Sequence, residues 1–138
     1  MKNEILISPS LLSADFGNLK ADLDKINASE ADWLHIDIMD GVFVPNIFVW
    51  LSCLEICAEL SKKPLDVHLM IVQPEKFIPE VKDLGAMMMN VHFEACPHLH
   101  RVVQQIKEAG NEGRGYPESG NTGFPCWQIS LKKWIWYC

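Results

Sequence analysis

The chain has 138 residues, 49% of them hydrophobic, which is enough for one small domain with its own core. The formal net charge is −6 and no block of Lys or Arg stands against it. This charge excludes proteins that depend on electrostatic attraction to nucleic acid or to an anionic membrane. The apolar run at residues 5–7 is too short for a signal-peptide core or a membrane span, and the five cysteines lack a disulfide spacing, which together predict a cytoplasmic protein.

Apolar runs of strand length alternate along the chain with segments in which apolar residues recur every three or four positions. The predicted strands are residues 5–11, 33–39, 65–71 and 87–93. The predicted helices are residues 15–28, 51–60, 74–85 and 97–109. Ser13 or Asp15 is expected to cap the first helix, Pro74 to open the third and Gly110 to stop the fourth.

Four strand–helix units in a row predict an α/β fold with parallel strands and crossover helices. A (β/α)₈ TIM barrel needs eight such units and about 250 residues, so the pattern predicts the N-terminal half of a barrel, truncated after about four βα units. The composition changes after Gly110, and no strand–helix period continues beyond it. We therefore expect a partial barrel domain at residues 1–110 and an aberrant, poorly ordered tail at residues 111–138.

Three side chains of two neighbouring predicted strands could hold a metal ion. His35 and Asp37 are two apart in one strand and so face the same side, and His68 takes the corresponding place in the next strand. Two imidazoles and a carboxylate suit a divalent cation such as Zn, Fe, Mn or Co. From spacing alone, two hydrogen-bonded core histidines beside a strand-end Asp remain an equal alternative.

Five segments of the sequence resemble signature segments of the ribulose-phosphate 3-epimerases. They are Pro-Ser-Leu-Leu-Ser-Ala-Asp (9–15), His-Ile-Asp-Ile-Met-Asp-Gly (35–41), Phe-Val-Pro-Asn (43–46), Leu-Asp-Val-His-Leu-Met (65–70) and His-Phe-Glu-Ala (92–95). One such segment would be weak evidence, but the five follow one another in the order and at the spacing of the family. The resemblance implies an isomerase that interconverts D-ribulose 5-phosphate and D-xylulose 5-phosphate in the pentose phosphate pathway.

The resemblance also implies roles for individual residues. Ser10 and His68 would contact the sugar phosphate, and His35, Asp37 and His68 would bind the metal. Asp37 would further serve as one of two acid/base groups that move the proton on C3 through an enediolate.

Met39 and Met70 match methionines that line the site in the family. The same side chains could equally be ordinary core filling.

The sequence also departs from the family. In the family, the later half of the barrel carries the second acid/base Asp, which is also the fourth metal ligand. It also carries the phosphate-binding loops. Residues 111–138 match neither feature. Read in shifted frames, the codons of this tail can encode family-like segments, so the tail looks frameshifted; a chimeric or newly evolved tail is the alternative. Trp50 stands where the family usually has a small residue.

Several functions therefore stay open. The expected partner is a small sugar phosphate, with no nucleic acid and no membrane, and a homo-oligomer is a further option. Ribulose-phosphate 3-epimerase activity is the leading interpretation, and allulose-6-phosphate 3-epimerase is a close alternative. The chain could instead be a non-catalytic truncated remnant, or a module that only binds a metal or a sugar phosphate.

Overall fold

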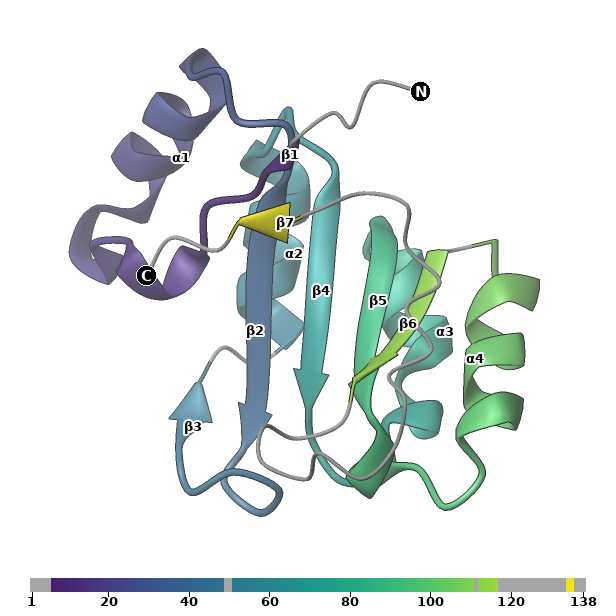
Figure 1. Cartoon of the computed structure of the whole chain (residues 1–138). Coiled ribbons are helices and arrows are strands. Elements are labelled where there is room, and N and C mark those ends of the chain that lie inside the picture. Colours follow the sequence, from purple (N-terminus) through teal and green to yellow (C-terminus); the bar gives the residue numbers. More distant parts are fainter. Residues whose placement is uncertain (1–5, 49–50, 111, 117–133, 136–138) are drawn as a thin grey trace.

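A computed structural model of the chain describes residues 6–48, 51–110, 112–116 and 134–135 (Figure 1). Its strands are β1 (Leu6–Ile7), β2 (Leu34–Asp40), β3 (Ile47–Phe48), β4 (Leu65–Met70), β5 (Ala86–His92), β6 (Glu112–Tyr116) and β7 (Trp134–Ile135). Its α-helices are α1 (Leu19–Ala28), α2 (Leu51–Leu60), α3 (Ile78–Asp83) and α4 (Leu99–Glu108). Short 3₁₀ turns lie at Leu11–Ser13, Phe16–Asn18, Pro74–Lys76 and Phe93–Ala95.

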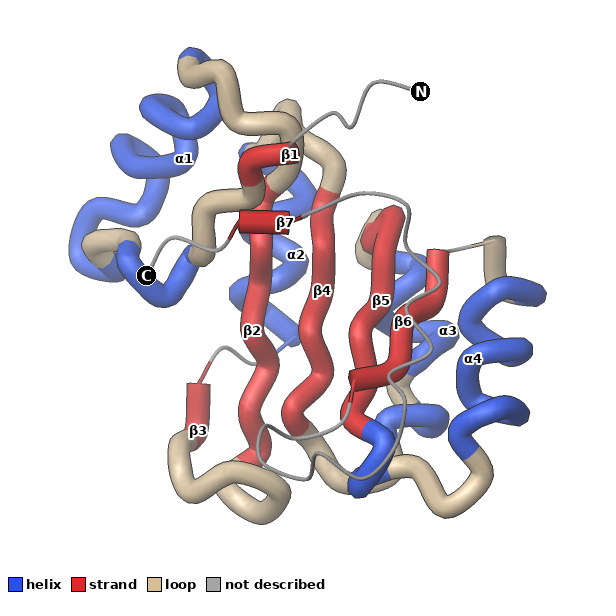
Figure 2. The backbone as a smooth tube through the Cα atoms, viewed as in Figure 1, coloured by secondary structure: helices blue, strands red, loops and turns tan. Residues whose placement is uncertain are grey.

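The main sheet has five strands in the order β3-β2-β4-β5-β6 (Figure 2). Strands β2, β4, β5 and β6 pair in parallel, and the short β3 pairs antiparallel with the end of β2. Each parallel neighbour is reached through a helix, because parallel strands cannot be joined by a tight turn. The predicted α/β fold with parallel strands is confirmed, and it is consistent with part of a TIM barrel.

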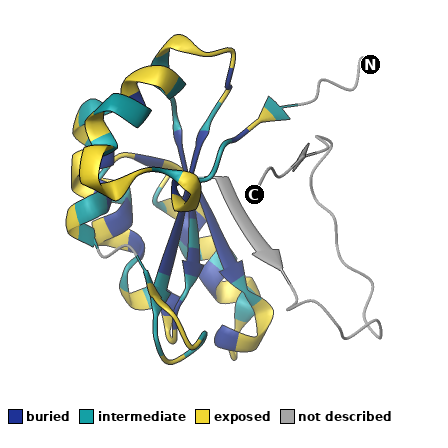
Figure 3. Ribbon diagram, turned by 90° about the vertical axis from the view of Figure 1, so that its left-hand side faces the viewer, coloured by how far each residue is buried: buried dark blue, intermediate teal, exposed yellow. Residues whose placement is uncertain are grey.

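The strands of the sheet alternate between two chemically different faces. Apolar residues of β2 and β4 point toward the helices and form the core with Leu54 and Cys57 of α2; they are Leu34, Ile36, Ile38, Leu65, Val67 and Leu69. The intervening residues of the same strands are His35, Asp37, Asp66 and His68. The helices lie on one side of the strands (Figure 3), so the polar residues face the side opposite the helical layer.

The first strand is shorter than the sequence predicts. The sequence predicts a strand at residues 5–11, but of the described residues 6–11 only Leu6–Ile7 forms one, and a 3₁₀ helix begins at Leu11. Pro9 has no N–H to donate, so it cannot continue a ladder. The carbonyl of Pro9 still accepts the N–H of His35 at 2.9 Å, and Ser10 forms an isolated parallel β-bridge with His35. The N-terminal segment therefore still runs beside β2.

The third predicted helix is divided into two pieces. Pro74 opens a 3₁₀ turn at Pro74–Lys76, and α3 then begins at Ile78. Pro79 lacks the N–H that would bond back to the carbonyl four residues earlier, so the helical hydrogen bonds are interrupted at this point. The end of the helix agrees with the prediction, because Gly85 adopts a positive φ of 87°.

The fourth helix ends where the sequence predicts, but the segment after it does not follow the prediction. Gly110 follows α4 with a positive φ of 84° and ends the helix, as predicted. Beyond it, however, Glu112–Tyr116 forms β6, parallel to β5, where the sequence pattern predicted no strand. A five-residue strand with two glycines gives no alternation of apolar and polar residues to recognise. Most of the remaining tail, together with Trp50, lies outside the described residues.

No helix in the described part of the chain has both the length and the apolar character needed to cross a membrane.

Candidate metal and active site

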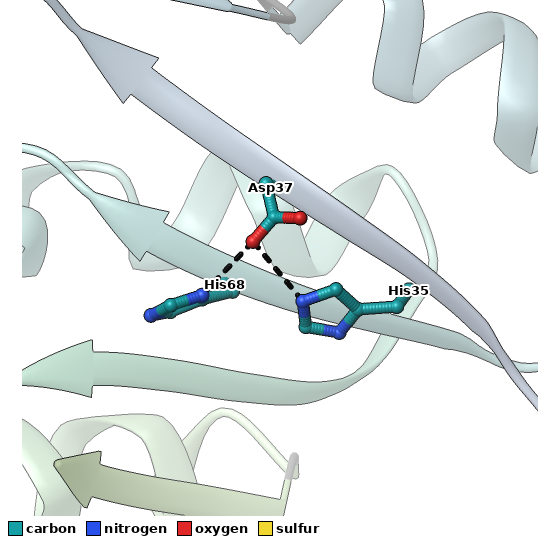
Figure 4. Close-up of side chains that lie close together, drawn as sticks. All are labelled: His35, Asp37 and His68. Carbon is teal, nitrogen blue, oxygen red and sulfur yellow. Dashed lines mark hydrogen bonds and ion pairs between the residues drawn. The ribbon is translucent and has the colours of Figure 1, made fainter. Parts of the chain in front are cut away.

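The candidate site lies on the polar face of the sheet, along β2 and the neighbouring strand β4. Asp37 and His68 occupy paired positions in the parallel register of these strands. His35 lies two residues before Asp37 on the same face. Figure 4 shows the three side chains pointing toward one another from the two strands. The convergence expected from the sequence is therefore present.

One carboxylate oxygen is the centre of this group. Asp37 Oδ1 lies 3.1 Å from His35 Nε2 and 3.0 Å from His68 Nδ1. The three potential ligand atoms lie within 4.8 Å of one another. His35 and Asp37 are buried, and His68 is only partly exposed. Two imidazole nitrogens and one carboxylate oxygen form a donor set that fits a divalent transition metal.

Ser10 reaches the same carboxylate from the N-terminal segment. Its hydroxyl donates to Asp37 Oδ2 at 3.1 Å and accepts the N–H of Leu12 at 3.2 Å. The side chain thus caps the 3₁₀ turn that follows it and at the same time holds Asp37. Three separate segments of the chain therefore meet at Asp37.

The hydrogen bonds in this group shift the pKa values of His35 and Asp37 in opposite directions. Burial by itself would lower the pKa of His35, but hydrogen bonds to Asp37 and Asp66 outweigh it and raise this pKa to about 9. Burial by itself would raise the pKa of Asp37, but hydrogen bonds from His35 and His68 hold it well below its ordinary value. Without a metal, the site is therefore an ion pair between a protonated imidazole and an ionised carboxylate.

The structure adds two residues that the sequence interpretation missed. Asp66 Oδ2 lies 2.9 Å from His35 Nδ1, and Asn90 Nδ2 donates to Asp66 Oδ1 at 2.5 Å. Both side chains are buried. A sequence signal did exist for Asp66, because it lies two residues before His68 and so on the same face of its strand. Asn90 shares this face too, but only the strand pairing places it beside the others.

His92 is the outer neighbour of His68. The Nε2 atoms of the two rings lie 2.8 Å apart, and the rings stack with their centroids 4.8 Å apart. Phe43, from the loop after β2, lies with its ring centroid 5.0 Å from that of His92. His92 belongs to the segment 92–95 that resembles the family, and its contact with His68 makes it part of the surroundings of the site.

Met39 and Met70 are paired neighbours at the ends of β2 and β4. Both are half-buried and follow Asp37 and His68 by two residues on the same face. This position is compatible with lining the space beyond the carboxylate and imidazole groups.

Asp40 has a structural part at the same end of the sheet. Its carboxylate accepts the N–H groups of Val42, Phe43 and Val72 at 2.8 to 2.9 Å. The side chain therefore ties the loop after β2 to the loop after β4.

Comparison with known proteins gives a consistent result. The model of the "Ribulose-phosphate 3 epimerase family" matches residues 6–114. The ribulose-phosphate 3-epimerase of Synechocystis sp. is 46% identical over 114 residues, which are 81% of this chain and 50% of that protein. That of Bacillus subtilis is 48% identical over 106 residues, or 77% of this chain and 49% of that protein. The chloroplastic ribulose-5-phosphate-3-epimerase of Arabidopsis thaliana is 43% identical over 111 residues, or 79% of this chain and 40% of that protein.

The chain thus spans about half the length of the curated relatives that it matches. The matched region contains β2, β4 and β5, and with them every residue of the site described above. A family match over most of the chain, identities above 40% and a parallel sheet with a polar face all agree. The chain belongs to the ribulose-phosphate 3-epimerase family.

Proposed function

We propose that this protein contributes the first half of a ribulose-phosphate 3-epimerase site, with Asp37 as the group that exchanges a proton with C3 of the sugar. The observation that supports this most strongly is the position of the Asp37 carboxylate. One of its oxygens lies between two imidazole nitrogens, and the other accepts the hydroxyl of Ser10. The carboxylate is thereby fixed in orientation and kept ionised, as a proton acceptor must be.

The proposed metal ligands are His35, Asp37 and His68, and the proposed ions are Zn, Fe, Mn or Co. When bound, such an ion polarises the substrate carbonyl and stabilises negative charge on the enediolate. Ser10 and His68 are proposed to contact the sugar phosphate, and Met39 and Met70 to line its path.

Inversion at C3 requires a second acid on the opposite face of the sugar. The family resemblance assigns that second carboxylate, and the phosphate loops, to the later half of the barrel. Removal and return of the C3 proton on a single face needs only one of the two carboxylates, Asp37. The two halves of the reaction can therefore be tested separately on this chain.

The test is to incubate the chain with ribulose 5-phosphate in deuterium oxide, with each of the four metal ions in turn. Formation of xylulose 5-phosphate is followed by a coupled assay, and exchange at C3 is followed by proton NMR. We expect exchange that depends on the metal, and Asp37→Asn should reduce it by about 100-fold or more. Asp24→Asn, on the exposed face of α1, removes the same charge outside the site and should leave exchange unchanged.

The outcomes separate the functional classes. Formation of xylulose 5-phosphate establishes a complete epimerase, and exchange without inversion establishes the half-site. Metal binding without exchange contradicts the catalytic proposal and favours a binding module. If the chain shows neither metal binding nor exchange, the result favours a non-catalytic remnant. The same assay with allulose 6-phosphate decides which of the two sugars is preferred.

A further inference from the structure

We propose that Asp66, held in place by Asn90, is a positioning residue that decides which ring nitrogen of His35 faces Asp37 and so controls metal affinity. This inference rests on the metal centre of the proposed function, but it concerns two residues to which no role has been assigned above.

The geometry around His35 supports the first step. Its ring lies between two carboxylates, with Nδ1 2.9 Å from Asp66 Oδ2 and Nε2 3.1 Å from Asp37 Oδ1. A carboxylate oxygen accepts hydrogen bonds, so Asp66 favours the ring form that carries a hydrogen on Nδ1. The Nε2 lone pair is then the one left for a metal beside Asp37, as in other carboxylate–histidine–metal arrangements.

Asn90 supports the second step, because it fixes Asp66 itself. The amide of Asn90 donates to Asp66 Oδ1, so both oxygens of this carboxylate have a defined partner. The three residues come from the adjacent strands β2, β4 and β5, all at positions on the polar face. His35, Asp66 and Asn90 are 0%, 3% and 1% exposed, so solvent does not compete for these bonds.

The burial of Asp66 also argues for a role beyond packing. Removing a carboxylate from water is costly, and an apolar side chain of similar size would fill the same space at lower cost. The apolar core of the sheet lies on the opposite face, among residues such as Val67 and Leu54. A buried carboxylate with one amide and one imidazole partner is therefore better explained by the orientation of His35 than by the core.

The experiment measures Zn²⁺ binding to the purified chain by calorimetry, for the wild type, Asp66→Asn and Asn90→Ala. Proton–nitrogen NMR of the Zn²⁺-loaded proteins identifies the nitrogen of His35 that binds the metal. Loss of an outer partner of a metal-binding histidine typically weakens binding by about 10- to 100-fold, which is the change expected for Asp66→Asn. Asn90→Ala leaves Asp37 and Asp66, the two carboxylates beside His35, in place and should weaken Zn²⁺ binding less. Asp24→Asn, outside the site, should not change Zn²⁺ affinity.

The NMR readout distinguishes positioning from general stability. In the wild type, His35 should bind Zn²⁺ through Nε2 with its hydrogen on Nδ1, and Asp66→Asn should produce a mixture of the two ring arrangements. Equal Zn²⁺ affinity and an unchanged His35 spectrum in Asp66→Asn would overturn the proposal. If Asp66→Asn does not fold, Asn90→Ala decides, because affinity equal to the wild type would then overturn it. A wild-type chain that binds no Zn²⁺ overturns the metal centre itself, and with it this inference.

Discussion

Asp37 is the residue on which the electrostatics of the site depend. Its carboxylate has partners on β2, on β4 and in the N-terminal segment, namely His35, His68 and Ser10. Each of these contacts favours the ionised form over the protonated form. A metal that binds here replaces the proton on the His35 nitrogen, so the same geometry serves an ion pair or a metal centre.

The raised pKa of His35 and the lowered pKa of Asp37 predict how the stability of the metal-free chain depends on pH. The His35 contribution is fully present below its unfolded pKa of 6.5 and is lost as the pH rises toward about 9. The Asp37 contribution is present above its unfolded pKa of 3.8 and is lost as the pH falls below it. We expect maximal stability between these two values and a loss on the order of a few kcal/mol toward alkaline pH.

Urea unfolding of the chelator-treated protein at several pH values measures this dependence. His35→Gln removes the titrating imidazole and should flatten the alkaline side of the profile. A wild-type profile that is already flat between pH 6.5 and 9 would show that His35 does not carry the proton in the folded state.

Among single residues, the sequence located His35, Asp37 and His68 because their positions in two strands could be counted. It did not indicate that Asp66 and Asn90 bond to each other, since these residues are 24 positions apart and meet only through the pairing of β4 with β5.

At the scale of elements, each central strand serves the core and the site at once. In β4, Leu65, Val67 and Leu69 pack toward the helices, whereas Asp66 and His68 face the other way. A shift of one residue in register would exchange these two sets. The core therefore determines the positions of the polar side chains of the candidate site.

Helix α2 allows this dependence on the core to be tested. Leu54 is fully buried beneath the sheet, whereas Ile56 on the same helix is 45% exposed. We expect Leu54→Ala to lower the free energy of unfolding by about 2–5 kcal/mol, because it leaves a cavity in the core. Ile56→Ala should change it by no more than about 0.5 kcal/mol. Chemical denaturation of both variants checks the difference, and equal effects would contradict the described packing of α2.

The predicted elements agreed best where apolar residues repeat regularly. Residues 51–60 were predicted as a helix and form α2 with the same bounds. The prediction was wrong in detail where proline removes a hydrogen-bond donor, as at Pro9 and Pro79, because the apolar pattern does not register a missing N–H.

At the scale of the whole molecule, the main sheet is open. Among the described strands, β3 pairs only with β2, and β6 pairs only with β5. Sheet edges present backbone N–H and C=O groups that favour association with another chain. We therefore predict self-association that increases with protein concentration, measured by size-exclusion chromatography with light scattering. A monomer at all concentrations, with one cooperative melting transition, would contradict this prediction.

The tail after Gly110 has its own test. If the tail is frameshifted by sequencing errors, resequencing of the encoding DNA from the codon of Gln105 to beyond that of Cys138 should show that two single bases in the present reading are absent from the gene. The corrected reading should then continue with family-like strands and loops. If both bases remain, the gene itself encodes this tail, either through a real frameshift or as a chimeric or newly evolved tail. The boundary at residue 110 and the cytoplasmic location stay predictions.

The sequence by itself determined the fold class, the family and three of the converging side chains. These follow from alternation along each strand and from short motifs, both of which are local properties. Only the tertiary structure decided that β6 extends the sheet, that Ser10 bonds to Asp37, and that Asp66 bonds to both His35 and Asn90. Those hydrogen bonds join residues 24 to 31 positions apart on separate segments of the chain, and only the folded arrangement of the segments brings them within bonding distance.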